Sequence, residues 1–256
     1  MKPSGDCSTI GENGCLVAEI FLSVIVPAYN EAKRLGPSLE TIRAYLQNQK
    51  YFSEILVVDD GSTDATVETA KSKLAGFPHA VLLNGTNQGK GYSVKQGMLE
   101  GKGRYLLFTD ADLSTPIEEC TRFLELMADG KYECVIGSRA LPGSQIEVHQ
   151  NMLRELMGKV FNRIARSLSF KGISDSQCGF KCFSQKAARD LFSRQKLKGF
   201  SFDAEILFLA QKLGYRVLEA PVIWRNSAQS RVKMVSDPLA MFADLVRMRW
   251  MHRDLG

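Results

Sequence analysis

The fold class of this chain is decided by Glu54-Ile55-Leu56-Val57-Val58-Asp59-Asp60-Gly61-Ser62-Thr63-Asp64. A short apolar run that ends in carboxylates and glycine predicts a buried β-strand followed by a turn. The residues that follow, 64–74, have the character of a helix. The stretch is therefore one strand and the polar link to one helix.

The same strand-then-helix order recurs through the first half of the chain. Short apolar runs predict strands at 22–27, 54–58, 80–83, 104–109 and 132–137. Helices are predicted at 37–48, 64–74, 91–100 and 116–127, with prolines 37 and 116 near helix starts. Alternation of this kind predicts an α/β fold with a mostly parallel central sheet and helices on both faces.

Composition narrows the class of protein further. The chain has 256 residues, 45% hydrophobic and 24% charged, which excludes a disordered or fibrous protein. A net charge of +5 is too small to indicate nucleic-acid binding by itself. Six cysteines without Cys-x-x-Cys spacing suggest reduced thiols in a cytoplasmic protein. No apolar run approaches the ~20 residues that span a bilayer, so we expect any membrane contact to be peripheral.

Four polar clusters stand directly after four of the predicted strands, at 27–31, 59–64, 87–91 and 110–112. In parallel sheets, ligands bind at the carboxyl ends of the strands. Each cluster alone has a simpler interpretation. Asp60-Gly61 could be a turn with Ser62 or Thr63 capping the next helix, and residues 89–91 could be a flexible helix entry. The latter match neither a Walker A loop nor a dinucleotide fingerprint.

The sharpest pair of candidate residues is Asp110 and Asp112. In an extended segment, residues two apart point to the same side, so we expect the two carboxylates to converge. Converging carboxylates favour a cation, and Mg²⁺ or Mn²⁺ takes its other ligands from phosphates and water. The alternative is a solvated turn after a strand. A metal–diphosphate site is favoured because this pair, like the three other polar clusters, directly follows an apolar strand.

In their order and spacing, the four clusters resemble the family 2 inverting glycosyltransferases with a GT-A fold. Residues 137–139, 175–181 and 202–205 are similar to the dolichyl-phosphate glucosyltransferase branch of that family. The resemblance runs from about residue 21 to 250. It implies a flexible lead-in (1–20) and a single GT-A domain (21–256), with a nucleotide-sugar half (21–138) and an acceptor half (139–256).

The resemblance also implies a donor site for a nucleotide sugar. UDP-glucose is the favoured donor, and GDP-mannose is the alternative. Asp110 and Asp112 would hold Mg²⁺ or Mn²⁺ and, with Arg139, are the implied catalytic residues. The implied donor-binding residues are Pro27, Ala28, Tyr29, Glu31, Asp59, Asp60, Asn87, Lys90, Asp110 and Ala111.

The acceptor expected for this branch is a polyprenyl or dolichyl phosphate. A lipid phosphate is already anionic and needs cations, which arginine can supply in bidentate form. The predicted acceptor-binding residues are Arg139, Arg154, Asp175, Gln177 and Lys181. A solvated helix face is the alternative for Arg154.

Two other functions remain open from the sequence. A transferase to a soluble or sugar hydroxyl would need a carboxylate base, with Asp175, Asp203 or Glu205 as candidates. A non-enzymatic nucleotide-sugar-binding protein is the third possibility, although the intact strand-end clusters argue against it.

Two amphipathic segments, 149–170 and 238–252, carry arginines beside aromatic residues and methionines. This pattern suits a helix lying on anionic lipid. The alternative is that both pack on the sheet with solvated arginines. We expect a cytoplasmic enzyme that is peripheral on the membrane.

Overall fold

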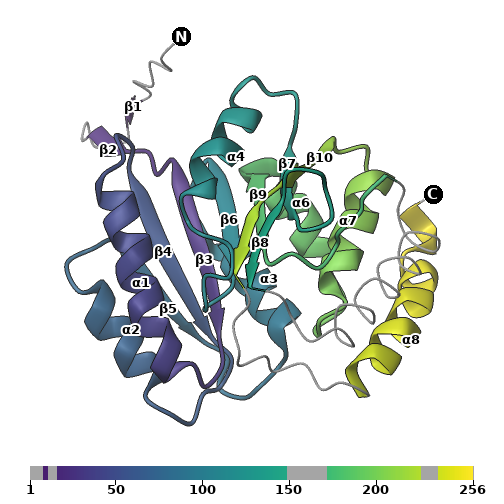
Figure 1. Cartoon of the computed structure of the whole chain (residues 1–256), viewed down its shortest axis with the longest axis horizontal. Helices are drawn as coiled ribbons and strands as arrows, with labels where there is room; N and C mark the ends of the chain where they lie inside the picture. Colours follow the sequence, from purple (N-terminus) through teal and green to yellow (C-terminus); the bar gives the residue numbers. More distant parts are fainter. Residues whose placement is uncertain (1–7, 11–15, 149–171, 226–235, 256) are drawn as a thin grey trace.

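The computed structural model describes residues 8–10, 16–148, 172–225 and 236–255. Its main sheet contains β3 (Leu22–Ala28), β4 (Ser53–Asp59), β5 (His79–Leu83), β6 (Tyr105–Thr109), β7 (Cys134–Ser138), β9 (Phe180–Ser184) and β10 (Val217–Pro221). Their order is β10-β7-β9-β6-β3-β4-β5 (Figure 1). Neighbours pair in parallel, except that β9 is antiparallel to β6 and β7. The predicted mostly parallel sheet is confirmed.

Helices cover both faces of this sheet. One face is packed by α1 (Ala32–Gln47), α2 (Thr66–Leu74) and α4 (Glu119–Ala128), and the other by α3 (Lys90–Glu100), α6 (Gln185–Arg194) and α7 (Phe202–Lys212). Successive residues of β3 serve opposite faces: Val24 and Val26 join the first cluster and Ile25 joins the second. A strand buried on both sides reads as a continuous apolar run, which is why the sequence revealed it.

The last helix forms an outer layer. α8 (Ser236–Met251) packs on the side of α7 away from the sheet through Leu245 and Met248, and the short 3-10 helix η1 (Arg253–Leu255) follows it (Figure 1). Among the described residues, no helix has both the length and the apolar character needed to cross a bilayer.

Helix α1 begins five residues before the predicted start at Pro37. The residues just before that proline are held in place by the loop that leads into α2. The backbone N–H of Glu31 donates to Thr66 Oγ1 at 2.8 Å, and that of Ala32 donates to Asp64 Oδ2 at 3.2 Å. These bonds satisfy amide groups at a helix start, so the helix begins earlier and carries Pro37 inside it.

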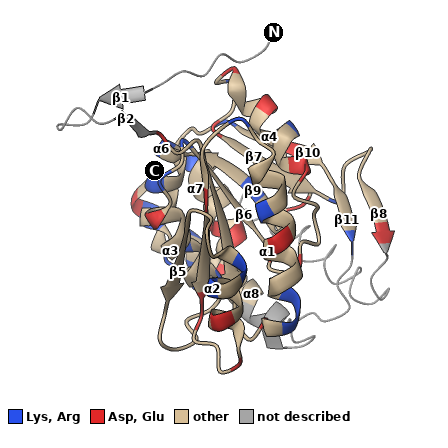
Figure 2. Cartoon of the chain, turned by 90° about the vertical axis from the view of Figure 1, so that its left-hand side faces the viewer, with Lys and Arg blue, Asp and Glu red and all other residues tan. Residues whose placement is uncertain are grey.

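Two short ribbons flank the main sheet. β1 (Ser8–Ile10) pairs with β2 (Leu16–Ala18), both within the predicted lead-in. β8 (Gln145–Val148) pairs with β11 (Ile223–Arg225), and in Figure 2 this ribbon stands apart from the main sheet. The predicted helix at 149–170 lies outside the described residues, and the division of the chain into two halves stays a prediction.

Candidate active site

The predicted strand-end clusters lie at one edge of the sheet. β3, β4, β6 and β7 all run in the same direction, so their carboxyl ends share that edge. Asp59 ends β4, Asp110 follows β6 and Arg139 follows β7. An ion pair of 2.6 Å between Lys90 Nζ and Asp110 Oδ1 joins the third cluster to the fourth. We take this edge as the candidate active site.

The loop after β3 is fixed by the loop after β4. Asn30 has a left-handed backbone, with φ of +52°, which asparagine tolerates better than most residues. Its N–H donates to Ser62 Oγ at 2.8 Å, and its side-chain Oδ1 accepts from the Thr63 N–H at 2.7 Å. Pro27 and Ala28, which were predicted to bind the donor, are buried within β3. They are the last two residues of the strand that leads into the loop.

The neighbouring carboxylates Asp59 and Asp60 are both buried but differ in what they leave available. Both oxygens of Asp60 are occupied: Oδ1 accepts from Asn84 Nδ2 and the Gln88 N–H, and Oδ2 from the Gly89 N–H. Asp60 therefore shapes the loop that leads to Lys90. Asp59 Oδ2 accepts two backbone N–H groups of the following turn, but its Oδ1 has no hydrogen-bond partner among the described residues. One carboxylate oxygen of Asp59 is therefore a buried acceptor that these residues leave unsatisfied.

Asp110 and Asp112 lie in a tight turn, so the expectation of an extended segment was wrong. The Leu113 N–H donates to the Asp110 carbonyl at 3.0 Å, and Leu113 has φ of +47°. Asp112 Oδ1 accepts from the N–H and the hydroxyl of Ser114, at 3.1 and 2.9 Å. The second oxygen of Asp112 and the carboxylate of Asp110 are both partly exposed beside cations.

Two cations neutralise this turn. Burial would lower the pKa of Lys90, but the carboxylates of Asp110 and Asp203 outweigh it and raise the pKa. Arg34, a residue that sequence reasoning missed, reaches Asp112 Oδ2 with Nη1 at 3.4 Å. Glu31 grips the same guanidinium through two bonds of 2.5 and 2.7 Å and so fixes its direction. Arg34 lies in the first turn of α1, where a solvated arginine is the ordinary expectation.

Gly179 closes the site from the side of β9. Its carbonyl accepts from the Asp110 N–H at 3.2 Å, and a Cβ at this position would overlap the Asp110 carboxylate. The position therefore requires glycine because of close approach. Of the other predicted donor residues, Asn87 is exposed in its loop, Tyr29 is half-buried, and Ala111 packs into the core.

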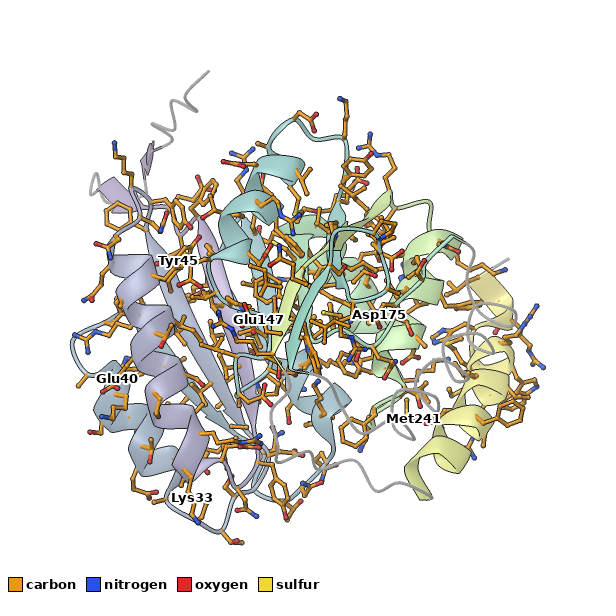
Figure 3. All side chains as sticks on the ribbon, in the orientation of Figure 1. Lys33, Glu40, Tyr45, Glu147, Asp175 and Met241 are labelled. Carbon is orange, nitrogen blue, oxygen red and sulfur yellow. The ribbon has the colours of Figure 1, made fainter. Side chains whose placement is uncertain are left out.

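Arg139 is held in a fixed orientation by two neighbours. Nε and Nη2 donate to the two oxygens of Asp175 at 2.7 and 2.9 Å, and the guanidinium lies 5.4 Å from the centre of the Trp224 ring. Burial alone would raise the pKa of Asp175, but Arg139 outweighs it and lowers the value to about 2. Asp175 is buried, and Figure 3 labels it among the elements that surround it. Arg139 itself is only partly buried, so it keeps a face for a ligand.

The structure corrects the expectation that Lys181 binds the acceptor. Lys181 is fully buried in β9, where its ammonium donates to the Cys178 carbonyl at 2.6 Å and pairs with Asp203. It lies over the Phe108 ring, 5.2 Å from the centroid. A side chain so enclosed cannot meet a lipid phosphate, and its charge serves the packing of β9 against α7. Arg154 lies outside the described residues.

The candidate carboxylate bases are likewise enclosed. Glu205 accepts from the N–H groups of Lys196 and Leu197, at 2.9 and 2.8 Å, and pairs with His252 at 2.6 Å. Burial raises the pKa of Asp203, partly offset by Lys181. Gln177 has a buried Nε2 without a hydrogen-bond partner in the described part of the chain.

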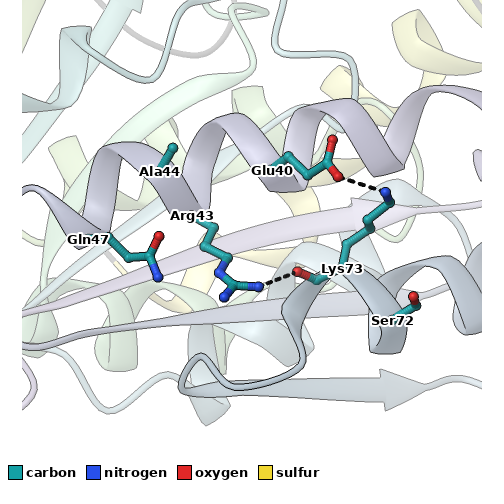
Figure 4. Close-up of a pocket in the computed structure, with 6 residues that line it drawn as sticks. All are labelled: Glu40, Arg43, Ala44, Gln47, Ser72 and Lys73. Atoms are coloured by element: carbon teal, nitrogen blue, oxygen red, sulfur yellow. Dashed lines mark hydrogen bonds and ion pairs between the residues drawn. The ribbon is translucent and has the colours of Figure 1, made fainter.

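A groove between α1 and α2 is separate from these residues. It is lined by Glu40, Arg43, Ala44, Gln47, Ser72 and Lys73 (Figure 4). Its cations are engaged: Lys73 pairs with Glu40 at 2.7 Å, and Arg43 donates to two backbone carbonyls. It contains none of the strand-end residues, so it is not the candidate site.

The sequence matches the family model described as Glycosyl transferase family 2 over residues 23–192. It is 37% identical to a dolichyl-phosphate beta-glucosyltransferase of Trichomonas vaginalis over 241 residues, which cover 90% of this chain and 71% of that protein. It is 35% identical to a dolichyl-phosphate beta-glucosyltransferase of Dictyostelium discoideum, with 94% and 77% covered.

A solved structure with the same fold is glucosyl-3-phosphoglycerate synthase from Mycobacterium tuberculosis in complex with Mn²⁺, UDP-glucose and phosphoglyceric acid. Its TM-score is 0.65, with 17% identity and coverage of 90% of this chain and 78% of that one. Mannosyl-3-phosphoglycerate synthase from Rubrobacter xylanophilus has a TM-score of 0.63, with 20% identity, 92% of this chain and 75% of that one covered. These likenesses confirm the predicted fold.

Proposed function

Because the chain belongs to glycosyl transferase family 2 and is thus a hexosyltransferase, we propose that it moves glucose from UDP-glucose to a polyprenyl phosphate at a membrane surface. The observation that carries this proposal is the distribution of charge at the site. Arg139 presents a fixed cation, whereas the three carboxylates that could serve a hydroxyl acceptor as base are enclosed: Asp175, Asp203 and Glu205. An anionic phosphate needs the cation and does not need the base.

The donor would be held by the loops after β3 and β4. The unpartnered Asp59 Oδ1 is a buried acceptor, and the imide N–H of uracil is a donor of matching polarity. The curated relatives are named for transfer of glucose, which supports a glucose donor over GDP-mannose. The solved structure from Mycobacterium tuberculosis, which has the same fold, is in complex with UDP-glucose.

A divalent cation fits the Asp110–Asp112 turn. The turn offers two partly exposed carboxylates, and Mg²⁺ or Mn²⁺ is usually bound by one or two carboxylates plus phosphate oxygens. Lys90 and Arg34 pair with these carboxylates and hold them in place. Held there, the ion would neutralise the charge that develops on the departing diphosphate. Lys90 is the first residue of α3, so the diphosphate would lie between its ammonium and the first amides of that helix.

The acceptor would bind on the other side of the sugar. One face of Arg139 is held by Asp175, so the remaining face can receive a phosphate without reorganising. A phosphate oxygen would attack the anomeric carbon while the bond from that carbon to the diphosphate breaks on the opposite side. An α-linked donor would then give a β-linked lipid product and UDP.

The test is transfer by the purified chain with Mn²⁺ or Mg²⁺ and a short polyprenyl phosphate in detergent. UDP-glucose and GDP-mannose are supplied in parallel, and both nucleoside diphosphate release and lipid-linked sugar are measured. We expect lipid-linked glucose from UDP-glucose alone. Product from GDP-mannose alone would overturn the donor, and binding of UDP-glucose without any lipid product would overturn the acceptor.

A further inference from the structure

The outward face of α8 carries a row of exposed apolar side chains. Phe242, Val246 and Trp250 are 46%, 56% and 67% exposed, and their spacing of four residues puts them on one side of the helix. The opposite side is buried: Leu245 and Met248 pack against α7. The row is therefore left over after the helix has made its contact with the fold.

Exposed large hydrophobic side chains are rare on the rest of the described surface. Only five large hydrophobic side chains are exposed in the described residues, and three of them form this row. The other two, Phe52 and Leu83, stand singly at distant places, before and at the end of strands. Single exposed apolar residues need no explanation, whereas a contiguous row indicates a binding surface.

The charges beside the row indicate what it binds. Arg247, Arg249 and Arg253 are exposed on α8 and just after it, and the Arg253 guanidinium lies 5.4 Å from the centre of the Trp250 ring. Asp254 is an exposed acid beside them and forms an exposed ion pair with Arg253 at 3.6 Å. Asp244 is turned toward the fold, where its carboxylate accepts from the Ser201 hydroxyl at 2.9 Å. The surface is thus apolar and basic together.

We propose that the outward face of α8 docks this enzyme on an anionic lipid bilayer. Phe242, Val246 and Trp250 would enter the boundary between headgroups and acyl chains, and the arginines would meet the lipid phosphates. An aromatic row edged by arginines complements such a surface, because tryptophan and arginine each combine an apolar body with a polar end. The proposal rests on the proposed function, since a polyprenyl phosphate resides in a membrane.

Docking through α8 would also orient the active site. Three polar contacts tie α8 and its C-terminal end to α7 and the segment before it: Ser201 with Asp244, Glu205 with His252, and Lys196 Nζ with the Met251 carbonyl at 2.6 Å. The same segment contacts the third strand-end cluster, because Lys198 Nζ donates to Gln88 Oε1 at 3.0 Å. A bilayer bound to α8 is therefore linked to the loop that carries Lys90.

Tryptophan fluorescence can test this, because the chain has two tryptophans in different surroundings. Trp224 is 8% exposed and Trp250 is 67% exposed, so a change on binding reports Trp250. The full chain is titrated with vesicles of phosphatidylcholine, with or without phosphatidylserine, that lack polyprenyl phosphate. We expect a blue shift with the anionic vesicles and quenching by brominated lipid. Trp250→Phe should remove the shift.

Variants identify the face that binds. Phe242→Ser with Val246→Ser should lower the affinity for vesicles, measured by co-sedimentation, about tenfold or more, because apolar burial in the bilayer is lost. Arg247→Gln with Arg253→Gln should remove the preference for anionic lipid. Phe52→Ser, which changes an exposed phenylalanine elsewhere on the surface (64% exposed), is the control and should bind as the parent chain does.

Three outcomes would overturn the docking surface. One is no vesicle binding by a chain that still makes lipid-linked glucose in detergent, which leaves the proposed function intact. Another is equal loss of binding in Phe52→Ser. The third is a blue shift that follows protein concentration without lipid, together with dimers in sedimentation, which would assign the face to a second copy. Vesicle binding without transfer in detergent would instead contradict the proposed function.

Discussion

The proposed donor half of the site, at the ends of β4 and β6, and the proposed acceptor half, around β7 and β9, differ in how they place charge. At the ends of β4 and β6, Asp59 and Asp110 lie where a polar residue after an apolar strand should lie, at the ligand-binding edge of the sheet. In the acceptor half, Lys181 looks similar in sequence but is buried and paired with Asp203 from α7. Residue type and position after a strand therefore predict which edge of the sheet binds ligands. Whether a charged side chain is accessible there depends on the residues that pair with it in the folded chain.

The largest effect is expected in the donor half, from Asp112→Asn. Loss of one carboxylate from a two-carboxylate metal site should reduce glucose transfer on the order of 10³-fold. The turn should survive, because asparagine keeps an oxygen for the Ser114 hydrogen bonds. Initial rates and Mn²⁺ affinity by calorimetry measure the effect. Asp129→Asn, an exposed carboxylate after α4, is the control, and near-parental transfer by Asp112→Asn would remove the metal assignment.

The next effect tests the buried pair in the acceptor half. Lys181→Met leaves Asp203 without its main cation in the interior, which should lower the free energy of unfolding by about 3–5 kcal/mol. Lys181→Met with Asp203→Leu should recover much of that loss, because both charges are gone. Denaturant unfolding measures both variants. If Lys181→Met kept parental stability and lost only acceptor binding, the sequence-based role for Lys181 would be restored.

These particulars show why the sequence revealed the fold better than the site. Strands β3, β4 and β6 are buried on both faces, so they appear as short runs dominated by apolar residues. Strand β9 was missed because Lys181 interrupts its apolar run, and the charge is tolerated only because Asp203 meets it from another element. The same holds for Arg34, whose relation to Asp112 spans 78 residues. Contacts of that range leave no periodic signal in one sequence.

A third prediction separates the two halves functionally. Arg139→Ala should raise the KM for polyprenyl phosphate about 10- to 100-fold, the range for a lost charge-assisted hydrogen bond. Donor affinity should stay unchanged, because Arg139 bonds to Asp175 and stacks on Trp224 in the acceptor half. Acceptor kinetics and UDP-glucose calorimetry measure the two separately. Arg139→Lys is the control, which keeps the charge without the bidentate guanidinium. If Arg139→Ala lost donor affinity as strongly as acceptor affinity, Arg139 would belong to the donor site.

Acid sensitivity should come from the same acceptor-half pair. Asp175 has a pKa of about 2 in the folded chain, against an ordinary value of 3.8. Its ionised form therefore stabilises the fold fully at pH values above the ordinary pKa. That contribution, about 2 kcal/mol, should be lost as pH falls from about 4 to 2. Denaturant unfolding across this range measures it. Asp175→Asn should flatten this part of the pH profile, and an unchanged slope would show that other carboxylates cause it.

The smallest effect is expected outside both halves, at the groove between α1 and α2. Lys73→Gln breaks an exposed ion pair with Glu40, and exposed pairs contribute about 0–1 kcal/mol. Transfer should match the parent chain, because no strand-end residue lines the groove. Salt should reduce the small stability difference further, since exposed charges are screened. A clear loss of UDP-glucose affinity in Lys73→Gln would show that a surface far from the strand ends contributes to the donor site, and that the edge of the sheet alone does not define it.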